Sequence, residues 1–587
     1  MSVLNKKWHI KNTDASASLL EKLLANRNLR DHRSIKTFLE PSIKDLYNPF
    51  LMNDMRKAVN RIKQAIKDEE RIIIYGDYDV DGITGTTIAV RVLRHLNAKV
   101  SYRLPHRTED GYGLNEKFIH EFKKLGVKLL ITVDCGISCA KEISLAKSFG
   151  IDTIIADHHT VPENTPKDSY AILHPKCEGS LYPFKDLTGA GVALKLAYAL
   201  LSDEKDETKI DKFAEDFLDL ASLGTIADLG LLTDENRIIV KYGMEKMKHS
   251  KWDGLKYLKH YSGIKQEDVI DTQMVGFRLA PRINAAGRVA HPYYALRLLL
   301  EDGEDKGQTD ALAQKLEGFN SNRQSITEKA LRQAEEMFLK DNKKKILIAH
   351  STEWHSGIIG LIAGKLTDKH HLPSIVMNET AGMFVASARS PGFFNIVAAI
   401  SEFGHLLEHF GGHAAAAGFT LKKENLKKFT KAMEDYADKK IKKADYENIL
   451  EIDAEINADE ITSETLKTIN KFEPFGIGNP TPVLLIKNIK TQNVSVIGKN
   501  KDHLKFRSLL SNKSTSALKQ IDTIGFRFGP FAKDILKSQS LDIVFNLQNN
   551  TFNGRTQLQM NVVDLKINGY KVKSNNLYKL IYINFIL

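Results

Sequence analysis

The chain has 587 residues, a hydrophobic fraction of 42%, a charged fraction of 27% and a formal net charge of +11 at pH 7. The length predicts about three to five domains, and the composition excludes general disorder. No apolar run reaches the ~20 residues of a membrane-spanning helix. The excess of Lys and Arg suits a polyanionic partner such as nucleic acid, although many basic proteins bind none.

Cysteine use and the start of the chain indicate the compartment. The three cysteines are too few for a disulfide framework or a four-cysteine zinc site. The first residues lack the apolar core of a secretory signal. We therefore expect a reduced, cytoplasmic protein.

Short β-branched runs alternate with helical patterns from about residue 68. Such alternation, with continuously apolar strands, is typical of a doubly wound parallel sheet. Residues 189–340 are mostly helical in pattern. The expected strands are 71–76, 99–104, 128–133 and 152–156, and the expected helices are 84–96, 116–125 and 140–149.

A second α/β segment begins with a strand at 345–350 and a helix at 358–366. Residues 421–444 are rich in lysine at helical spacing, which is typical of a solvated basic helix and also suits a phosphate-facing surface. From about 450 to 570 short strands follow, two of them flanking Asn553-Gly554, a strong hairpin signal. A small β-barrel or sandwich is expected there.

Acids and imidazoles follow three of the predicted strands. In an open parallel sheet the carboxyl ends of the strands form the edge at which ligands bind. Taken singly, an Asp after a strand more often caps a helix, and paired histidines more often lie at the surface. The residues are Asp77, Asp79 and Asp81 after 71–76, Asp134 after 128–133, and Asp157, His158 and His159 after 152–156, with Asp228 in a later loop.

Gathered in one crevice, these acids would repel one another unless cations neutralised them. Oxygen-rich ligands with one or two imidazoles suit Mn²⁺ or Mg²⁺ better than zinc. A calcium loop of the Asp-x-Asp-x-Asp-Gly type is disfavoured, because Ile88 stands where its final Glu would be. A carboxylate-bridged metal pair is a common device for hydrolysing phosphodiesters.

Motifs along the chain resemble those of a known superfamily. GDYDVDG (76–82), VDCG (133–136), ADHH (156–159) and LGTIADLGLLTDENR (223–237) resemble the motifs of the DHH phosphoesterases. Further stretches resemble the RecJ family of 5′→3′ exonucleases within that superfamily. They are PHRTEDGYGLN (105–115), PRINAAGR (281–288), WHSGIIGLIAGKL (354–366), SARSPGFFN (387–395), FGGHAAAAGF (410–419), EPFGIGNPTPV (473–483) and LQNNTFNGRTQLQM (547–560).

The resemblance covers about residues 70–565 and implies an α/β protein with three domains. These are a doubly wound parallel-sheet DHH domain, a second α/β domain and a C-terminal β-barrel of the OB-fold. The expected segments are an N-terminal helical extension (1–67), the DHH catalytic domain (68–240), a helical continuation and connector (241–340), the DHH-associated substrate-binding domain (341–445), the OB-fold nucleic-acid-binding domain (446–570) and a tail (571–587).

The resemblance also implies roles at the predicted crevice. Asp134 would bridge two metal ions. Asp77 and Asp157 would orient ligands and hold imidazole tautomers, and His159 would act at the scissile phosphate as a donor or proton-transfer group. The full set of implied metal ligands is Asp79, Asp81, Asp134, His158 and Asp228.

Substrate contacts implied by the resemblance come from three places. Guanidinium groups clamp phosphates, so the 5′ end would be held by Arg282, Arg288, Ser387 and Arg389, with a structural salt bridge as the alternative for each arginine. Gly411, Gly412 and Gly418 would let backbone approach the strand and His413 would contact it; the alternative is close helix packing through small residues. In the barrel, Phe506, Phe526 and Phe552 are candidates for base stacking or for the core.

The implied activity is degradation of single-stranded DNA from the 5′ end to 5′ mononucleotides, with two Mn²⁺ or Mg²⁺ ions, in DNA repair and recombination. The strand would thread between the two α/β domains of a monomer, with a helicase and a single-strand-binding protein as partners and no membrane. The alternative is a DHH phosphodiesterase of short oligonucleotides or cyclic dinucleotides. Tyr75 favours the exonuclease, since the small-substrate enzymes usually carry histidine there. A non-catalytic scaffold is disfavoured because every expected ligand is present.

Overall fold

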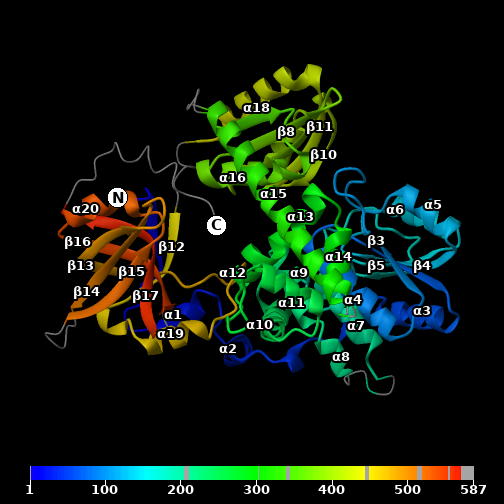
Figure 1. Cartoon of the computed structure of the whole chain (residues 1–587), viewed down its shortest axis with the longest axis horizontal. Helices are drawn as coiled ribbons and strands as arrows, with labels where there is room; N and C mark the ends of the chain where they lie inside the picture. The colour runs from blue at the N-terminus through cyan, green and yellow to red at the C-terminus, as the bar shows by residue number, and fades with distance from the viewer. Residues whose placement is uncertain are drawn as a thin grey trace. The chain divides into compact units, whose positions relative to one another are not determined.

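Figure 1 shows the computed structural model of the chain. It describes residues 2–203, 206, 210–301, 303, 305–338, 344–442, 449–511, 518–552 and 555–569. The chain forms two compact units: unit 1 comprises residues 1–35, 327–473 and 481–587, and unit 2 comprises 36–326 and 474–480. None of the described helices is both long and apolar enough to cross a membrane.

A five-stranded parallel sheet, ordered β3-β2-β4-β5-β6, forms the centre of unit 2. The chain reverses its direction of winding between β2 and β4, so the sheet has a topological switch point there. Figure 1 shows α5 and α6 on one face of the sheet and α3, α4 and α7 on the other. This confirms the doubly wound sheet. The strands are β2 (Arg71–Gly76), β3 (Val100–Arg103), β4 (Val127–Val133), β5 (Asp152–Ala156) and β6 (Ala171–Leu173).

The helices of unit 2 differ in burial because they differ in pattern. Residues 80–93 of α4 and all of α7 are buried, as expected for helices that are apolar on nearly every face. Helix α15 begins in unit 2 and continues into unit 1. The helices that lie wholly or partly in unit 2 are α2 (His32–Leu39), α3 (Met55–Lys67), α4 (Val80–His95), α5 (Glu116–Lys124), α6 (Ala140–Ser148), α7 (Gly189–Leu200), α8 (Lys212–Glu215), α9 (Leu218–Ala227), α10 (Asp234–Lys248), α11 (Asp253–Tyr261), α12 (Thr272–Met274), α13 (Ala280–Val289), α14 (Tyr293–Leu300) and α15 (Lys306–Phe338).

The second α/β domain lies in unit 1 and has a five-stranded mixed sheet, ordered β10-β11-β9-β8-β7. Helix α16 connects the parallel strands β7 and β8, and the other strands pair antiparallel. The lysine-rich stretch forms α18, which buries Phe429, Met433 and Ala437 on one face. The elements are β7 (Leu347–Ser351), α16 (Ile359–His370), β8 (Ser374–Thr380), β9 (Met383–Arg389), α17 (Ile396–Ser401), β10 (Leu407–His413), β11 (Ala416–Lys422) and α18 (Leu426–Lys440).

Unit 1 also contains the predicted barrel, which closes because β13 pairs with both β14 and β16. Strands β16 and β17 pair antiparallel, with Phe552 opposite Arg555. The predicted turn Asn553-Gly554 and the tail 571–587 lie outside the described residues. The elements are β12 (Ile449–Glu455), α19 (Ser463–Asn470), β13 (Leu484–Ile497), β14 (His503–Ser511), β15 (Leu518–Gly525), α20 (Ala532–Leu536), β16 (Ser540–Phe552) and β17 (Arg555–Asn568).

The N-terminal region differs from the expected helical extension over 1–67. It contains a strand, β1 (Lys7–Asn12), which pairs parallel with β12 and precedes α1 (Leu19–Ala25). The stretch KWHIKN alternates with the period of a strand, and Trp8 donates a hydrogen bond from Nε1 to Asp564 Oδ2 at 2.8 Å. Residues 1–35 therefore belong to unit 1, whereas 36–67 belong to unit 2.

Candidate metal centre

The predicted ligands gather at the carboxyl edge of the unit 2 sheet, beside the switch point between β2 and β4. Asp79 is the N-cap of α4, and its Oδ1 accepts a hydrogen bond from the Gly82 amide at 3.1 Å. Asp81, in the first turn of α4, accepts from the amides of Gly189 (2.6 Å) and Ala190 (2.9 Å) at the start of α7. Helix N-termini stabilise negative charge, so α7 holds the Asp81 carboxylate in place.

Asp134 follows β4 in a left-handed backbone conformation (φ +61°) that Asp tolerates better than most residues. The start of α7 approaches it closely: a Cβ at Gly189 would lie 2.5 Å from Asp134 Oδ1. Only glycine at 189 allows this approach. The Asp134 side chain is thereby fixed among the other acids.

His158 lies at the centre of the cluster. Its Nε2 is 3.1 Å from Asp134 Oδ1, 3.7 Å from Asp228 Oδ2 and 3.8 Å from Asp81 Oδ2. Asp228 is the C-cap of α9, so its position depends on how that helix ends. One imidazole thus faces carboxylates from three separate elements.

Asp157 and His159 form a second, adjoining arrangement. Asp157 Oδ1 accepts from the His158 amide at 2.7 Å and from His159 Nδ1 at 2.8 Å, and its Oδ2 accepts from the Ile137 amide at 3.0 Å. Because this carboxylate accepts the Nδ1–H hydrogen bond, Nε2 is the ring nitrogen that remains for another contact. This agrees with the predicted orienting role of Asp157.

The donor atoms form three groups, each within 4.8 Å: Asp134, His158 and His159; Asp81, His158 and Asp228; and Asp77, Asp79 and Asp134. Asp134 and His158 are each shared by two groups. Among the residues that the structure describes, Asp77 Oδ1, Asp134 Oδ1 and His158 Nε2 are buried without a hydrogen-bond partner. Such atoms cost free energy unless a ligand satisfies them, so these residues fit a pair of divalent cations.

The electrostatics of the acids supports the same conclusion. Burial and the neighbouring Asp79 raise the pKa of Asp77 to about 8, and burial and Asp79 raise the pKa of Asp228 to about 6. Burial, then neighbouring carboxylates, raise the pKa of Asp81 and Asp134 well above the usual range. The acids resist ionising together unless cations compensate.

The two imidazoles differ in charge. Burial lowers the pKa of His158 to about 3, so this ring is neutral and can be a metal ligand. Burial also acts to lower the pKa of His159, but the Asp157 carboxylate outweighs it and raises that pKa to about 8. A neutral ligand and a cationic neighbour thus lie side by side.

The loop 104–115 brings two further residues to the centre that the sequence analysis did not single out. The Arg107 guanidinium lies 4.2 Å from the centroid of the Tyr78 ring, and the Tyr112 hydroxyl lies 3.1 Å from His159 Nδ1. Both stand in the motif PHRTEDGYGLN, after the carboxyl end of a strand, and that position was the available signal. Tyr75, buried, supports the loop by donating to the Gly113 carbonyl at 2.9 Å.

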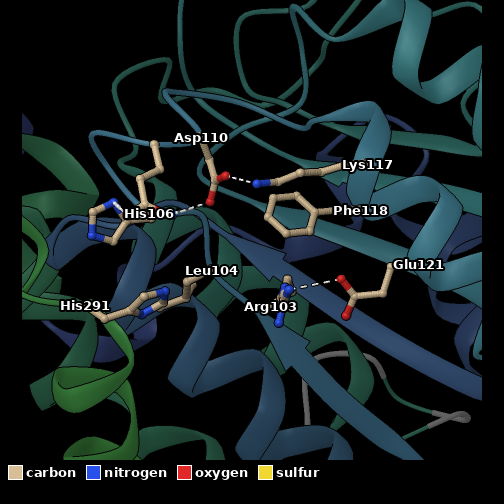
Figure 2. Close-up of a pocket in the computed structure, with 9 residues that line it drawn as sticks. Arg103, Leu104, His106, Asp110, Lys117, Phe118, Glu121 and His291 are labelled. Carbon is tan, nitrogen blue, oxygen red and sulfur yellow. Dashed lines mark hydrogen bonds and ion pairs between the residues drawn. The ribbon is translucent and has the colours of Figure 1, made fainter.

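Figure 2 shows how the other side of this loop is held. A pocket of about 340 Å³ lies there, and across it Lys117 pairs with Asp110, which also accepts from the His106 amide at 2.7 Å. Arg103 pairs with Glu121 at 2.9 Å. The loop that carries Arg107 and Tyr112 is therefore tied to α5.

The two predicted arginines of α13 differ. Arg282 Nε lies 2.5 Å from Glu317 Oε2, and Arg282 Nη1 donates to the Arg278 carbonyl at 2.6 Å, which is the salt bridge that the alternative interpretation expected. Arg288 lies in the last turn of α13, next to Gly287, where a Cβ would be 3.1 Å from the Tyr78 carbonyl oxygen. Arg288, but not the Arg282 guanidinium, is thus near the loop of Asp77 and Asp79.

Ser387 and Arg389 lie together on β9 in unit 1. Arg389 Nη1 donates to Ser387 Oγ at 3.1 Å. A Cβ at Gly360, in the first turn of α16, would lie 3.1 Å from Ser387 Oγ and 3.2 Å from Arg389 Nη2. The hydroxyl, the guanidinium and the start of a helix therefore converge, an arrangement that suits an anion.

Gly411, Gly412 and His413 lie on β10, the edge strand of its sheet, and all three are exposed. Gly412 has φ +144°, and a Cβ there would lie 2.4 Å from the Ala416 carbonyl oxygen. Gly418 lies on the neighbouring strand β11. Because the motif forms a β-hairpin, the helix-packing alternative is wrong.

The three phenylalanines proposed for base stacking differ in their exposure to solvent. Phe506 is 1% exposed and lies in the barrel core, so a stacking role for it is wrong; the register of β14 turns it inward. Phe526 is 51% exposed, with its ring centroid 5.4 Å from that of His503. The side chain of Phe552 lies outside the described part of the chain.

Three stretches of the chain match known families. Residues 71–225 match the DHH family, N-terminal domain, 325–439 the DHHA1 domain and 452–564 the RecJ OB domain. The chain is 37% identical to the single-stranded-DNA-specific exonuclease RecJ of Bacillus subtilis (strain 168), over 94% of this chain and 68% of that protein. It is 31% identical to the protein of the same name from Thermus thermophilus, over 88% of this chain and 71% of that protein.

The fold is similar to solved structures as well. The crystal structure of RecJ from Thermus thermophilus in complex with Mn²⁺ gives a TM-score of 0.80 at 27% identity and covers 96% of this chain and 80% of that one. The structure of the same protein with Mg²⁺ gives a TM-score of 0.73 at 26% identity and covers 96% of this chain and 78% of that one. Fold and site therefore define a DHH-type phosphoesterase. Within that class, the chain belongs to the RecJ family of single-stranded-DNA-specific exonucleases.

Proposed function

We propose that this protein is an exonuclease that degrades single-stranded DNA from the 5′ end to 5′ mononucleotides, using two Mn²⁺ or Mg²⁺ ions. The observation that carries the proposal is the sharing of Asp134 and His158 between groups of donor atoms at the switch point of the sheet. Family membership supports the substrate and the chemistry. When bound, two such ions lower the pKa of water and offset charge on the phosphate.

The residues of the centre have separate tasks in this proposal. Asp79, Asp81, Asp134, His158 and Asp228 would hold the ions, with Asp134 as the shared ligand. Asp77, which is buried and interacts electrostatically with Asp79, would orient that ligand loop. Asp157 fixes the His159 ring through Nδ1, so that Nε2 donates a hydrogen bond to a non-bridging oxygen of the scissile phosphate.

Substrate binding is proposed for both units. The site of Ser387, Arg389 and the start of α16 would take the terminal phosphate, and the edge strand β10, with Gly411, Gly412 and His413, would lie along the strand. In unit 2, Arg288 and Arg107 would contribute near the metal centre. Arg282 stays a prediction, since its guanidinium is held by Glu317. The passage of the strand between the two α/β domains also stays a prediction.

The cellular role follows from the family. We place the protein in DNA repair and recombination in the cytoplasm, where a helicase and a single-strand-binding protein would supply and protect unpaired strands. The match of 452–564 to the RecJ OB domain favours a polymer substrate over short oligonucleotides or cyclic dinucleotides.

The test is a cleavage assay with single-stranded oligonucleotides labelled at the 5′ or the 3′ end, alongside the duplex, in Mn²⁺ and in Mg²⁺. We expect a 5′ label to appear at once as mononucleotide, a 3′ label to pass through a ladder, and the duplex to be spared. Release that begins at the 3′ end, or dinucleotide turnover as fast as that of the long strand, would contradict the proposal.

A further inference from the structure

Four large apolar side chains of unit 2 are exposed around the end of α9. Leu229 is 68% exposed, Phe277 58%, Ile477 49% and Leu231 38%. Large exposed apolar residues are ordinary when scattered, but a group of them marks an interaction surface. We call these four residues the apolar patch.

Contacts within unit 2 join the members of the patch. The Leu232 amide donates to the Ile477 carbonyl at 2.7 Å, and a Cβ at Gly478 would lie 3.3 Å from Leu231 Cδ2. The loop 474–480 is held further by the Thr272 hydroxyl, which donates to the Phe475 carbonyl at 2.6 Å. The loop thus carries Ile477 to the segment that follows α9.

Phe277 joins the patch through the last turn of α9. A Cβ at its neighbour Gly276 would lie 3.8 Å from Ile226 Cγ2, and the Ile226 carbonyl accepts from the Leu229 amide at 3.2 Å. Phe277 stands in a π-helical turn, Val275–Leu279, a type of distortion often found at functional sites. The patch therefore surrounds the end of α9, next to the predicted ligand Asp228.

Leu229 occupies an unfavourable backbone position. With the Leu229 amide bonded to Ile226 and the Gly230 amide bonded to the Thr225 carbonyl at 3.0 Å, α9 ends in a Schellman motif. Leu229 is its left-handed residue (φ +57°), where glycine is preferred. The leucine side chain gains almost no burial there (68% exposed), which leaves it available for an external contact.

The proposed substrate supplies such a contact. A strand whose phosphodiester lay at the metal centre would bring the bases of the neighbouring nucleotides, its apolar parts, close to Asp228 and the patch beside it. Base faces stack on aromatic and aliphatic side chains whatever the sequence. In a duplex those bases are paired and stacked on each other, so they are not available.

We propose that the apolar patch of Leu229, Leu231, Phe277 and Ile477 binds the unpaired bases next to the scissile phosphate and so contributes to the preference for single strands. The proposal rests on the proposed function, because it takes single-stranded DNA as the occupant. A second copy of this chain is the competing occupant, and it would show as a change in sedimentation mass.

The test measures binding of a 5′-phosphorylated oligonucleotide without added metal in a D134N background, which removes cleavage. The probe has natural bases, or abasic sites at the first four nucleotides. The patch variants are L229G, which relieves the left-handed strain while removing the side chain, and F277A. We expect each to weaken binding of the natural probe about tenfold and binding of the abasic probe less than twofold.

The control is L125A, which truncates another exposed leucine (46%) before β4, at the opposite edge of the sheet. It should leave both probes unchanged. Equal losses on natural and abasic probes would overturn the proposal, and so would unchanged binding or a change in sedimentation mass without coupling to the bases. Failure of the exonuclease proposal would show separately, as no cleavage by the unsubstituted protein.

Discussion

Two buried polar clusters lie in unit 2, and α7 contributes to both. At its N-terminus, α7 binds Asp81 through backbone amides. Near its middle, Lys195 pairs with Glu235 at 2.5 Å, with both side chains 0% exposed. We call the second cluster the Lys195–Glu235 pair.

The two clusters differ in how their polar atoms are satisfied. Glu235 Oε1 also accepts from the Tyr47 amide at 2.8 Å and its Oε2 from the Tyr182 hydroxyl at 2.6 Å, while Lys195 donates to the Tyr47 carbonyl at 2.8 Å. In the metal centre, buried atoms of Asp77, Asp134 and His158 have no hydrogen-bond partner within the part of the chain that the structure describes. Burial of charge therefore does not by itself distinguish a site from a structural pair; unsatisfied atoms that converge with several carboxylates do.

Replacing Asp134 by Asn should have the largest effect on cleavage while leaving the stability of the metal-free protein unchanged. The amide keeps the shape and tolerates φ +61°, but it removes the carboxylate shared by two donor groups. We expect cleavage to fall by at least about 10³-fold and the metal-free protein to be no less stable. Single-turnover cleavage and urea unfolding measure the two effects.

The matched control is D54N, the same change at a left-handed Asp (φ +57°) outside the metal centre. It should keep cleavage within about twofold. A D134N protein that still cleaves DNA in a clean preparation would remove Asp134 from the metal centre.

Replacing Glu235 by Gln should have the opposite effect to D134N: it should lower stability and leave cleavage nearly unchanged. The isosteric amide leaves the Lys195 ammonium buried without a counter-charge, which costs about 3–5 kcal/mol of unfolding free energy. Cleavage at a temperature where the variant is folded should remain near normal. The double variant K195M/E235Q should recover part of the lost stability; a double variant as unstable as E235Q would argue against an ion pair as the cause.

A third buried cluster, around Asp219, is intermediate, because the partners of this acid are neutral. It accepts from Ser250 Oγ at 2.6 Å, the Leu220 amide at 2.7 Å and Trp252 Nε1 at 3.1 Å, yet burial raises its pKa to about 6. Between its unfolded pKa of 3.8 and about 6, the folded state binds more protons than the unfolded state. Stability contributed by protonated Asp219 is therefore present below pH 3.8 and lost as pH rises through 6, by about 3 kcal/mol.

Unfolding free energies of wild type and D219N, measured from about pH 4 to about pH 7, test this. The wild type should lose more stability than D219N over that range, and the difference between the curves isolates Asp219 from other titrating acids. Parallel curves would mean that Asp219 has an ordinary pKa.

Much of the metal centre was predictable, because the ends of parallel strands meet at one edge. Asp79, Asp134 and His158 follow from that rule together with the motifs. Asp228 was expected in a later loop and lies at the end of α9, so the strand rule does not account for it and its ligand role came from the resemblance. No local pattern could show that Arg282 pairs with Glu317 or that Arg107 reaches Tyr78, since both contacts depend on tertiary packing.

The errors have the same physical origin. The prediction of a helical extension over 1–67 overlooked the two-residue period of the sequence of β1. This segment forms a strand because it pairs with the edge of β12. Phe506 and Phe526 were both candidates for base stacking, and the register of the barrel decides that one is buried and the other exposed. Local sequence carries propensity, whereas register is set by the partner strand.

The smallest predicted effect is the stabilisation that Mn²⁺ gives by binding to the metal centre. A ligand that binds only the folded state stabilises it by RT ln(1 + [L]/Kd), about 1.4 kcal/mol at a tenfold excess over Kd. Mn²⁺ should therefore raise the unfolding free energy of wild type and of E235Q by the same increment, although their baselines differ, because Glu235 is not one of the proposed metal ligands. In D134N the increment should largely disappear. Thermal unfolding with and without Mn²⁺ measures all three, and an increment that survives in D134N but is lost in E235Q would reverse the distinction between the two clusters.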